Sequence, residues 1–351
     1  MMHITRRHFA AGTLAAVVGG SLASRARAQD ADAYLQQLYA AAKAAGQTQI
    51  TVYAASFADN VPLYQEFQKQ FPTISVKGTD LFGPPLEARL QAEFASGGPQ
   101  ADLIASGEPD LLNFKSHGWL QPFVPETAKG MPSQLIGPDN LWIGYATVPL
   151  GVILNSNAVS ADARPKTWKD LASPSWHGKT VMSNPGGING LSQGLAAAQK
   201  AGAIDPVWLE QVAANKPLIT PGAVAALQMV AGGQANMCPL TAYTQYRNAK
   251  KAGAPLDFLF PSEGYSALPA PFTLLAKAPH AEAAKLLMAW FMTPSAQAAL
   301  SGIGQPGSMP GAPPLSGMPP GTTTTRFILD WQYLQENYPG LLQKYKQIFG
   351  T

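Results

Sequence analysis

The chain of 351 residues contains a single cysteine, Cys238, so no intramolecular disulfide can form and its stability must come from packing. Charged residues make up only 13% of the chain, and the few lysines are scattered rather than gathered into a basic stripe. This distribution gives no indication of nucleic-acid binding. Apolar residues make up 46% of the chain, which predicts a sizeable core.

Motifs of common hydrolases are also missing. The chain has no Gly-x-Ser-x-Gly elbow, no His-Glu-x-x-His sequence and no Cys-His pair. Its five histidines form no spaced ligand set with nearby acids. We therefore expect neither an enzyme nor a bound cofactor, with an exported enzyme or sensor module as the alternative of another class.

The first 28 residues have the pattern of an export signal. Two adjacent arginines, Arg6 and Arg7, precede a mildly apolar run too short to span a bilayer, and Ala28 ends a small-x-small sequence. The arginine pair followed by Phe9 resembles a twin-arginine signal. Cleavage near Ala28 predicts a mature protein that works outside the cytoplasmic membrane, in the periplasm.

Removing this segment changes the charge of the protein. Four of the 24 basic residues lie in it, namely Arg6, Arg7, Arg25 and Arg27, and none of the 21 acidic ones does. The mature chain therefore carries 20 basic and 21 acidic groups, close to neutral. The mature chain, with the predicted signal removed, is still long enough for two domains.

Strand-like runs alternate with helical runs along the mature chain. Residues 49–54 are typical of a first strand, and residues 61–71 place apolar side chains at helical spacing up to Pro72. The alternation continues and predicts βαβ units with a largely parallel sheet, an α/β fold. Residues 302–325, rich in Pro, Gly and Thr, are predicted to wander over the surface.

Several short sequences, in order, resemble a known family. The mature chain is similar to the extracytoplasmic solute-binding proteins of ABC transporters, in the group that includes ferric-ion, polyamine, thiamine and phosphorylated-sugar binders. The sequences that carry the resemblance are residues 50–53, 86–93, 99–103, 165–171, 176–179, 221–224 and 281–285.

The resemblance implies a type II periplasmic-binding-protein fold, with two lobes joined by two crossing strands. The crossings are expected near residues 145–153 and 267–274. The expected division is a signal peptide at 1–28, a first lobe of 29–147 plus 272–320, and a second lobe of 148–271 plus 321–351. It also implies a monomer that binds a small-molecule ligand between the lobes and presents it to an ABC permease.

Ligands of parallel α/β sheets bind beyond the carboxyl ends of strands, where helix N-termini present unpaired amides. The glycine-rich turn at 186–190 is the best candidate of this kind. Its residues alone favour a flexible turn with an asparagine cap, whereas the resemblance, which places it where related proteins hold ligand anions, favours ligand binding. The full set of candidate ligand-binding residues is Ser56, Phe57, Phe82, Gly83, Ser106, Glu108, Tyr145, Gly187, Ile188, Asn189, Thr241, Tyr243 and Tyr265.

Two kinds of ligand remain open. Ferric binders of the family carry adjacent tyrosines, but here Thr244 follows Tyr243, so the pair is broken and only Tyr243 and Glu108 could serve iron. Hydroxyls, amides and aromatic faces favour a small organic anion such as a carboxylate, phosphonate or sugar phosphate. The organic anion is the main prediction, and a ferric-iron-binding protein is the alternative.

Overall fold

The computed structural model describes residues 29–55 and 57–351. The predicted signal peptide, 1–28, and the candidate residue Ser56 lie outside the described residues. Among the described residues, no helix is both long and apolar enough to cross a membrane.

A nine-stranded mixed sheet runs through the molecule, with the strand order β2-β1-β3-β10-β5-β8 and three further strands attached to β5 and β10. β6 and β7 form a separate two-stranded parallel sheet. The strands are β1 (Gln49–Ala54), β2 (Ser75–Asp80), β3 (Leu103–Ala105), β4 (Leu120–Gln121), β5 (Ile143–Asn155), β6 (Val181–Ser183), β7 (Leu218–Thr220), β8 (Met237–Ala242), β9 (Leu256–Leu259), β10 (Tyr265–Leu275) and β11 (Arg326–Ile328).

Helices cover these sheets, as the alternation in the sequence predicts. Residues 29–44 form the first helix. The others are α2 (Phe57–Gln70), α3 (Gly83–Ala95), α4 (Glu108–Ser116), α5 (Trp168–Leu171), α6 (Gly190–Lys200), α7 (Pro206–Ala214), α8 (Ala223–Ala231), α9 (Tyr243–Lys251), α10 (Ala281–Phe291), α11 (Pro294–Gly302) and α12 (Trp331–Phe349). Helices α4 and α7 each begin with a proline in the first turn, a position where proline is favoured.

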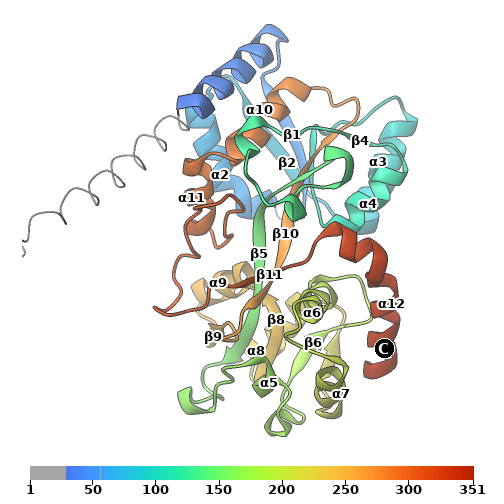
Figure 1. The fold of residues 1–351 in the computed structure, drawn as a ribbon, viewed down its shortest axis with the longest axis vertical. Coiled ribbons are helices and arrows are strands. Elements are labelled where there is room, and N and C mark those ends of the chain that lie inside the picture. Colours follow the sequence, from blue (N-terminus) through green and yellow to red (C-terminus); the bar gives the residue numbers. More distant parts are fainter. Residues whose placement is uncertain (1–28, 56) are drawn as a thin grey trace, which may run out of the picture.

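Two long strands, β5 and β10, connect two lobes (Figure 1). They pair antiparallel from Ile143 and Phe272 at one end to Leu150 and Ser266 at the other. These strands coincide with the two crossings expected from the sequence.

Each lobe has its own hydrophobic core. The first core gathers buried residues from 35–146 and from 272–300, and the second gathers residues from 150–268 and from 329–345. Phe67, Phe272 and Phe291 are fully buried in the first core, and Trp168 and Tyr345 in the second. Because the cores are separate, the paired strands between them are the place where the lobes can move relative to each other.

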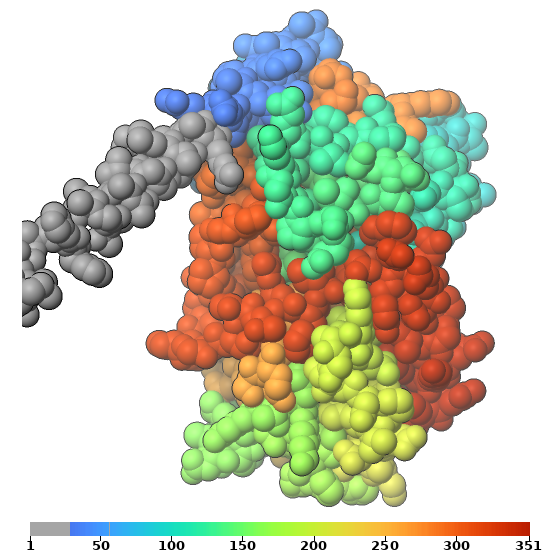
Figure 2. Space-filling model, in the orientation of Figure 1, coloured from blue at the N-terminus to red at the C-terminus, as the bar shows by residue number. Residues whose placement is uncertain are grey.

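The C-terminal residues lie across the middle of the molecule (Figures 1 and 2). Segment 303–325, from the end of α11 to β11, does not simply wander over the surface as the sequence suggested. Gln305 and Ser308 are buried, and the backbone oxygen of Pro306 accepts a hydrogen bond from the Thr147 amide of β5 at 2.9 Å. The segment is therefore packed against the connection between the lobes.

Candidate functional site

The direction of the strands brings loops from both lobes to the junction, the region where the two lobes meet. β1, β2 and β3 are parallel, and β3 pairs with β10 antiparallel through Ile104 and Thr273, so the carboxyl ends of these strands point toward the second lobe. β8 pairs with β5 antiparallel, with Ala242 opposite Leu150, so its carboxyl end points toward the first lobe. β6 runs parallel to β8 through a bridge at Thr180.

Six helices begin at these strand ends. They are α2, α3 and α4 in the first lobe and α6, α8 and α9 in the second. Since the first amides of a helix have no acceptor within it, the N-termini of both lobes face the junction with a partial positive charge. This arrangement suits an anionic group.

At the start of α2, Phe57 is already packed by the protein itself. Its amide donates to Oδ1 of Asp80 at 2.6 Å, and its ring stacks on Tyr64 with centroids 5.0 Å apart. A Cβ at Gly78 would lie 2.4 Å from the same ring, so glycine is required there. Phe57 forms a wall beside the junction.

The turn before α3 is open. Phe82 is 59% exposed, and Gly83 has a φ of +61° that glycine adopts without strain. The Gly83 amide donates to Oδ2 of Asp110 at 3.3 Å. Phe82 is therefore an aromatic side chain available to a ligand.

At the start of α4, the two predicted polar residues are used internally. The Ser106 hydroxyl donates to the Asp110 carboxylate. Glu108 is 3% exposed and accepts a 3.4 Å hydrogen bond from the indole of Trp142 through Oε1, whereas Oε2 has no partner among the described residues. Burial raises the pKa of Glu108 to about 8, and the negative charge of Asp330 adds to this while Trp142 and Lys200 oppose it.

Tyr145 is not at the junction surface. It lies in the core of the first lobe, where its ring stacks on Phe272 with centroids 4.3 Å apart and its hydroxyl accepts from Asn60 at 3.3 Å. The expectation that Tyr145 contacts a ligand is therefore corrected: its residue lies on the inward face of β5.

The glycine-rich turn of the second lobe has an asparagine cap. Asn189 accepts the Ser192 amide through Oδ1 at 3.2 Å, and its own side-chain amide donates to the Asn184 backbone at 2.7 Å. The amide of Gly187 also donates to the Asn184 oxygen, at 3.2 Å. Ile188 is 66% exposed, so the turn presents an apolar side chain beside the start of α6.

Tyr243, at the start of α9, is covered. It is 3% exposed, and its hydroxyl donates to the backbone oxygen of Ser316 at 3.2 Å. Burial raises the pKa of Tyr243, which the nearby Arg247 partly offsets. Thr241 is also buried and donates to the sulfur of Cys238 at 3.2 Å, so neither side chain is free to meet a ligand in this conformation.

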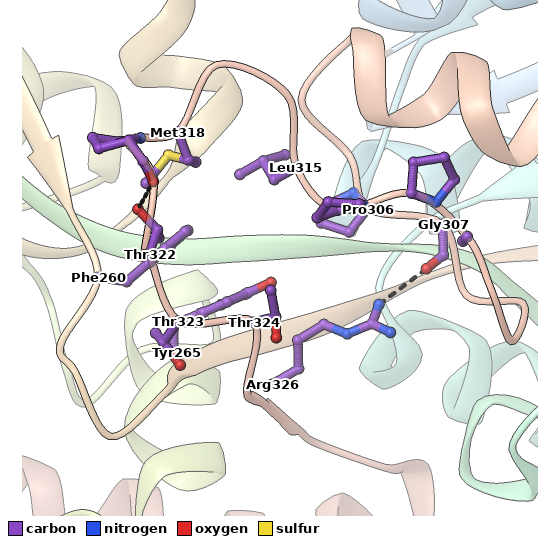
Figure 3. Close-up of a pocket in the computed structure, with 15 residues that line it drawn as sticks. Phe260, Tyr265, Pro306, Gly307, Leu315, Met318, Thr322, Thr323, Thr324 and Arg326 are labelled. Atoms are coloured by element: carbon purple, nitrogen blue, oxygen red, sulfur yellow. Dashed lines mark hydrogen bonds between the residues drawn. The ribbon is translucent and has the colours of Figure 1, made fainter. Parts of the chain in front are cut away.

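Tyr265 lies on β10 and is connected to Tyr243 by ring contacts through Phe258 and Phe260. It stacks on Phe260 with centroids 3.9 Å apart and lines a cavity of about 490 Å³ (Figure 3). The remaining lining comes mainly from segment 306–326, including Arg326. The sequence analysis did not identify these lining residues as candidates, although the run of four threonines before Arg326 could have drawn attention to them as a cluster of hydroxyl groups.

The donors considered for iron do not share partners. Tyr243 contacts the segment around Ser316, whereas Glu108 lies with Trp142 and near Asp330 and Lys200. Within residues 29–55 and 57–351, no group of three or more His, Cys, Asp or Glu side chains could hold a metal ion. The lobes also touch directly, since Asn248 of α9 donates to Asp59 of α2 at 3.4 Å.

Two lobes with opposed helix N-termini and a paired-strand connection define a binding protein that can close on a ligand. Residues 98–337 match the model of a family described as bacterial extracellular solute-binding protein. This match spans more than half of the chain, and the chain belongs to that family. The family consists of binding proteins rather than enzymes, as the missing catalytic motifs predicted.

One curated relative is similar over a short stretch. A probable ABC transporter periplasmic-binding protein, y4fP of Sinorhizobium fredii, is 28% identical over 103 residues, which is 29% of this chain and 28% of that protein. The aligned stretch is thus less than a third of the relative's length.

Solved structures resemble nearly the whole described chain. The Trichodesmium protein IdiA (FutA), in complex with iron and citrate, has a TM-score of 0.68 at 20% identity, and iron-bound HitA from Pseudomonas aeruginosa has 0.67 at 22%; each comparison covers 86% of this chain and 99% of the other. The substrate-binding protein of an ABC transporter from Agrobacterium tumefaciens has a TM-score of 0.70 at 14% identity, covering 86% and 94%. At these identities the likeness shows the two-lobed fold alone.

Proposed function

We propose that this protein is the substrate-binding component of an ABC importer and works in the periplasm after cleavage of its signal. The observation that carries the proposal is the arrangement of helix N-termini from both lobes toward the junction. The family and the name of the Sinorhizobium relative support it. The closed, ligand-bound form would be presented to a membrane permease, and the protein would act as a monomer.

The first lobe of this binding protein would consist of residues 29–147 with 272–320, and the second lobe of residues 148–271 with 321–351. The two separate hydrophobic cores support this division. Ligand binding would then draw the lobes together about β5 and β10, because contacts from both sides exist only in the closed state.

For the ligand we propose ferric iron bound as a complex with a small organic anion. Most of the similar solved structures named above bind iron, and this favours the iron alternative over a free organic anion. The chain itself offers Tyr243 as a phenolate donor but no cluster of three metal ligands among the described residues. The anion would therefore complete the coordination of iron, with its free oxygens on the helix N-termini.

Binding in this form requires Tyr243 to exchange its partner. Its hydroxyl now donates to Ser316, and iron would take the place of that proton. Phe82, Ile188 and the amides of α6 would contact the organic part of the complex, and Phe57, Gly83, Gly187, Asn189 and Thr241 would shape the site around it. Glu108, held neutral by burial, would not be an iron ligand at neutral pH.

A free organic anion is the second candidate, and the lack of a metal-ligand cluster is the observation that favours it. Thermal unfolding of the metal-stripped protein with ferric citrate and with citrate alone separates the two. A ligand at 100 times its Kd stabilises by about 2.7 kcal/mol. We expect stabilisation by ferric citrate, together with visible phenolate-to-iron absorption that Tyr243→Phe removes.

Tyr333→Phe is the matched control, because Tyr333 lies on α12 and should leave the absorption unchanged. Equal stabilisation by citrate alone, without absorption, would contradict the iron proposal and support the free anion. No stabilisation by any anion would contradict binding at the helix N-termini.

A further inference from the structure

The cavity beside Tyr265 adjoins the start of α9 without being lined by it, because Tyr243 donates to the backbone oxygen of Ser316 in the segment that forms one wall. None of the residues that line it comes from the starts of α2, α3, α4, α6, α8 or α9. Its walls come from β9–β10 and from segment 306–326, and its volume of about 490 Å³ is within the range of small-molecule sites. The function proposed for the junction leaves this cavity unexplained.

The cavity contains a cation without an acidic partner. Arg326 donates through one terminal nitrogen, Nη1, to the Gly307 oxygen at 3.0 Å (Figure 3). The same nitrogen donates to the Thr147 hydroxyl at 3.4 Å. Among the described residues, no Asp or Glu oxygen lies within 4.0 Å of its guanidinium. The two bonds hold the head group in place while Nε and Nη2 have no partner in the described part of the chain.

Hydroxyl groups lie in the same lining. Tyr265 is 4% exposed, and its hydroxyl has no hydrogen-bond partner among the described residues. Arg326 is close enough to oppose the rise that burial causes in the pKa of Tyr265. Thr324 also lines the cavity, whereas the Thr322 hydroxyl is already bonded to Pro319 at 2.7 Å.

The rest of the wall is apolar. Phe260 and Tyr265 stack on one side, and Leu315 and Met318 of the proline-rich segment face them (Figure 3). Prolines 306, 313, 314 and 319 complete the lining. Such a wall accepts an apolar body and offers few groups to a strongly hydrated ion.

We propose that this cavity is a second binding site, for a small organic carboxylate with an apolar or aromatic body. The carboxylate would pair with the free edge of the Arg326 guanidinium and accept from Tyr265, since a planar guanidinium matches a carboxylate with two parallel hydrogen bonds. The apolar body would lie between the Phe260–Tyr265 pair and Leu315. The residues that line the cavity differ from those proposed to contact the junction ligand.

The test uses benzoate as the probe and benzamide as its neutral isostere, with the mature protein and isothermal titration. We expect benzoate to bind at least about tenfold more tightly than benzamide, because a hydrogen-bonded charge pair is lost with the amide. Arg326→Gln should weaken benzoate by at least about tenfold, and Arg326→Lys should restore part of the affinity. Tyr265→Phe should weaken it less.

Lys251→Gln, at the exposed end of α9, removes one positive charge outside the cavity and should leave benzoate binding unchanged. Arg326→Gln should leave the response to ferric citrate intact, so the two sites fail separately. If Arg326→Gln is unstable, Leu315→Trp tests the proposal by filling the cavity without changing charge.

Three results would overturn the proposal. They are no benzoate binding at millimolar concentration, equal binding of benzoate and benzamide, and unchanged benzoate affinity in both Arg326→Gln and Leu315→Trp.

Discussion

Glu108 is a buried carboxyl group that the protein keeps neutral. In the unfolded chain its pKa returns to 4.5, whereas burial raises it to about 8 in the folded protein. The folded state therefore holds the proton more tightly between these two values. The contribution of Glu108 to the free energy of unfolding is therefore fully present below about pH 4.5. This contribution decreases as the pH rises, until the group ionises in the folded protein near pH 8.

This shift gives a prediction at the scale of the residue. Glu108→Gln keeps the hydrogen bond from Trp142 without an ionisable group, so it should remove most of the loss of stability between pH 5 and pH 9. One pKa unit corresponds to about 1.4 kcal/mol, so the difference should amount to a few kcal/mol. Denaturant unfolding at several pH values measures it.

Glu210→Gln is the matched control, because Glu210 is exposed and should not change the slope. An unchanged pH dependence in Glu108→Gln would mean that Glu108 is not the responsible group.

Tyr243 shows how far a single residue can be interpreted from sequence. Its position at the start of α9 was predicted correctly, as was the broken tyrosine pair. Its burial was not, because the partner of its hydroxyl, Ser316, lies 73 positions further along the chain. The local sequence around Tyr243 does not indicate such a contact.

At the scale of the element, the pairing of the crossing strands explains why they can contain prolines. Pro149 pairs opposite Ala267 and Pro269 opposite Thr147, in the stretch where β5 and β10 have no further long strand at either side. Proline cannot donate to a ladder and is tolerated at such edges. The pairing of β10 with β5 also shifts register between Ala270 and Pro271. The connection between the lobes is therefore less regularly hydrogen-bonded where a hinge is needed.

Gly151 marks the point where β5 enters the second lobe. A Cβ there would lie 2.2 Å from the ring of Phe258 and 2.7 Å from the Leu259 oxygen, which is backbone of β9. Gly151→Ala should therefore lower the free energy of unfolding by about 1 to 3 kcal/mol, the usual cost of overpacking. Chemical denaturation checks this value.

Gly302→Ala is its control, since nothing lies within 4 Å of a Cβ at that position at the end of α11. It should be neutral or slightly stabilising. A Gly151→Ala protein as stable as the wild type would show that β9 can move aside.

At the scale of the whole molecule, the two cores and the thin connection predict closure. Addition of ferric citrate to the metal-stripped protein should lower the radius of gyration measured by small-angle X-ray scattering. The reason is that a ligand held by helix N-termini of both lobes favours the closed state. Tyr243→Phe, with its weaker binding, should need more ligand for the same change.

An unchanged radius of gyration, in a sample where thermal unfolding shows that the ligand is bound, would contradict closure. It would mean that the protein is already closed without ligand, as the contact between Asn248 and Asp59 permits.

The sequence by itself determined the α/β alternation and the turns at the strand ends, which depend on periodicity and turn chemistry that neighbouring residues carry. Asn189 as the cap of α6 is of this kind. The two crossing strands were expected only from the resemblance to a known family. Only the tertiary structure decided that Tyr145 packs in a core, that Glu108 is buried, and that segment 303–325 covers Tyr243 and encloses a cavity with Arg326. Burial depends on contacts between residues far apart in the chain, and these exist only once both lobes have formed.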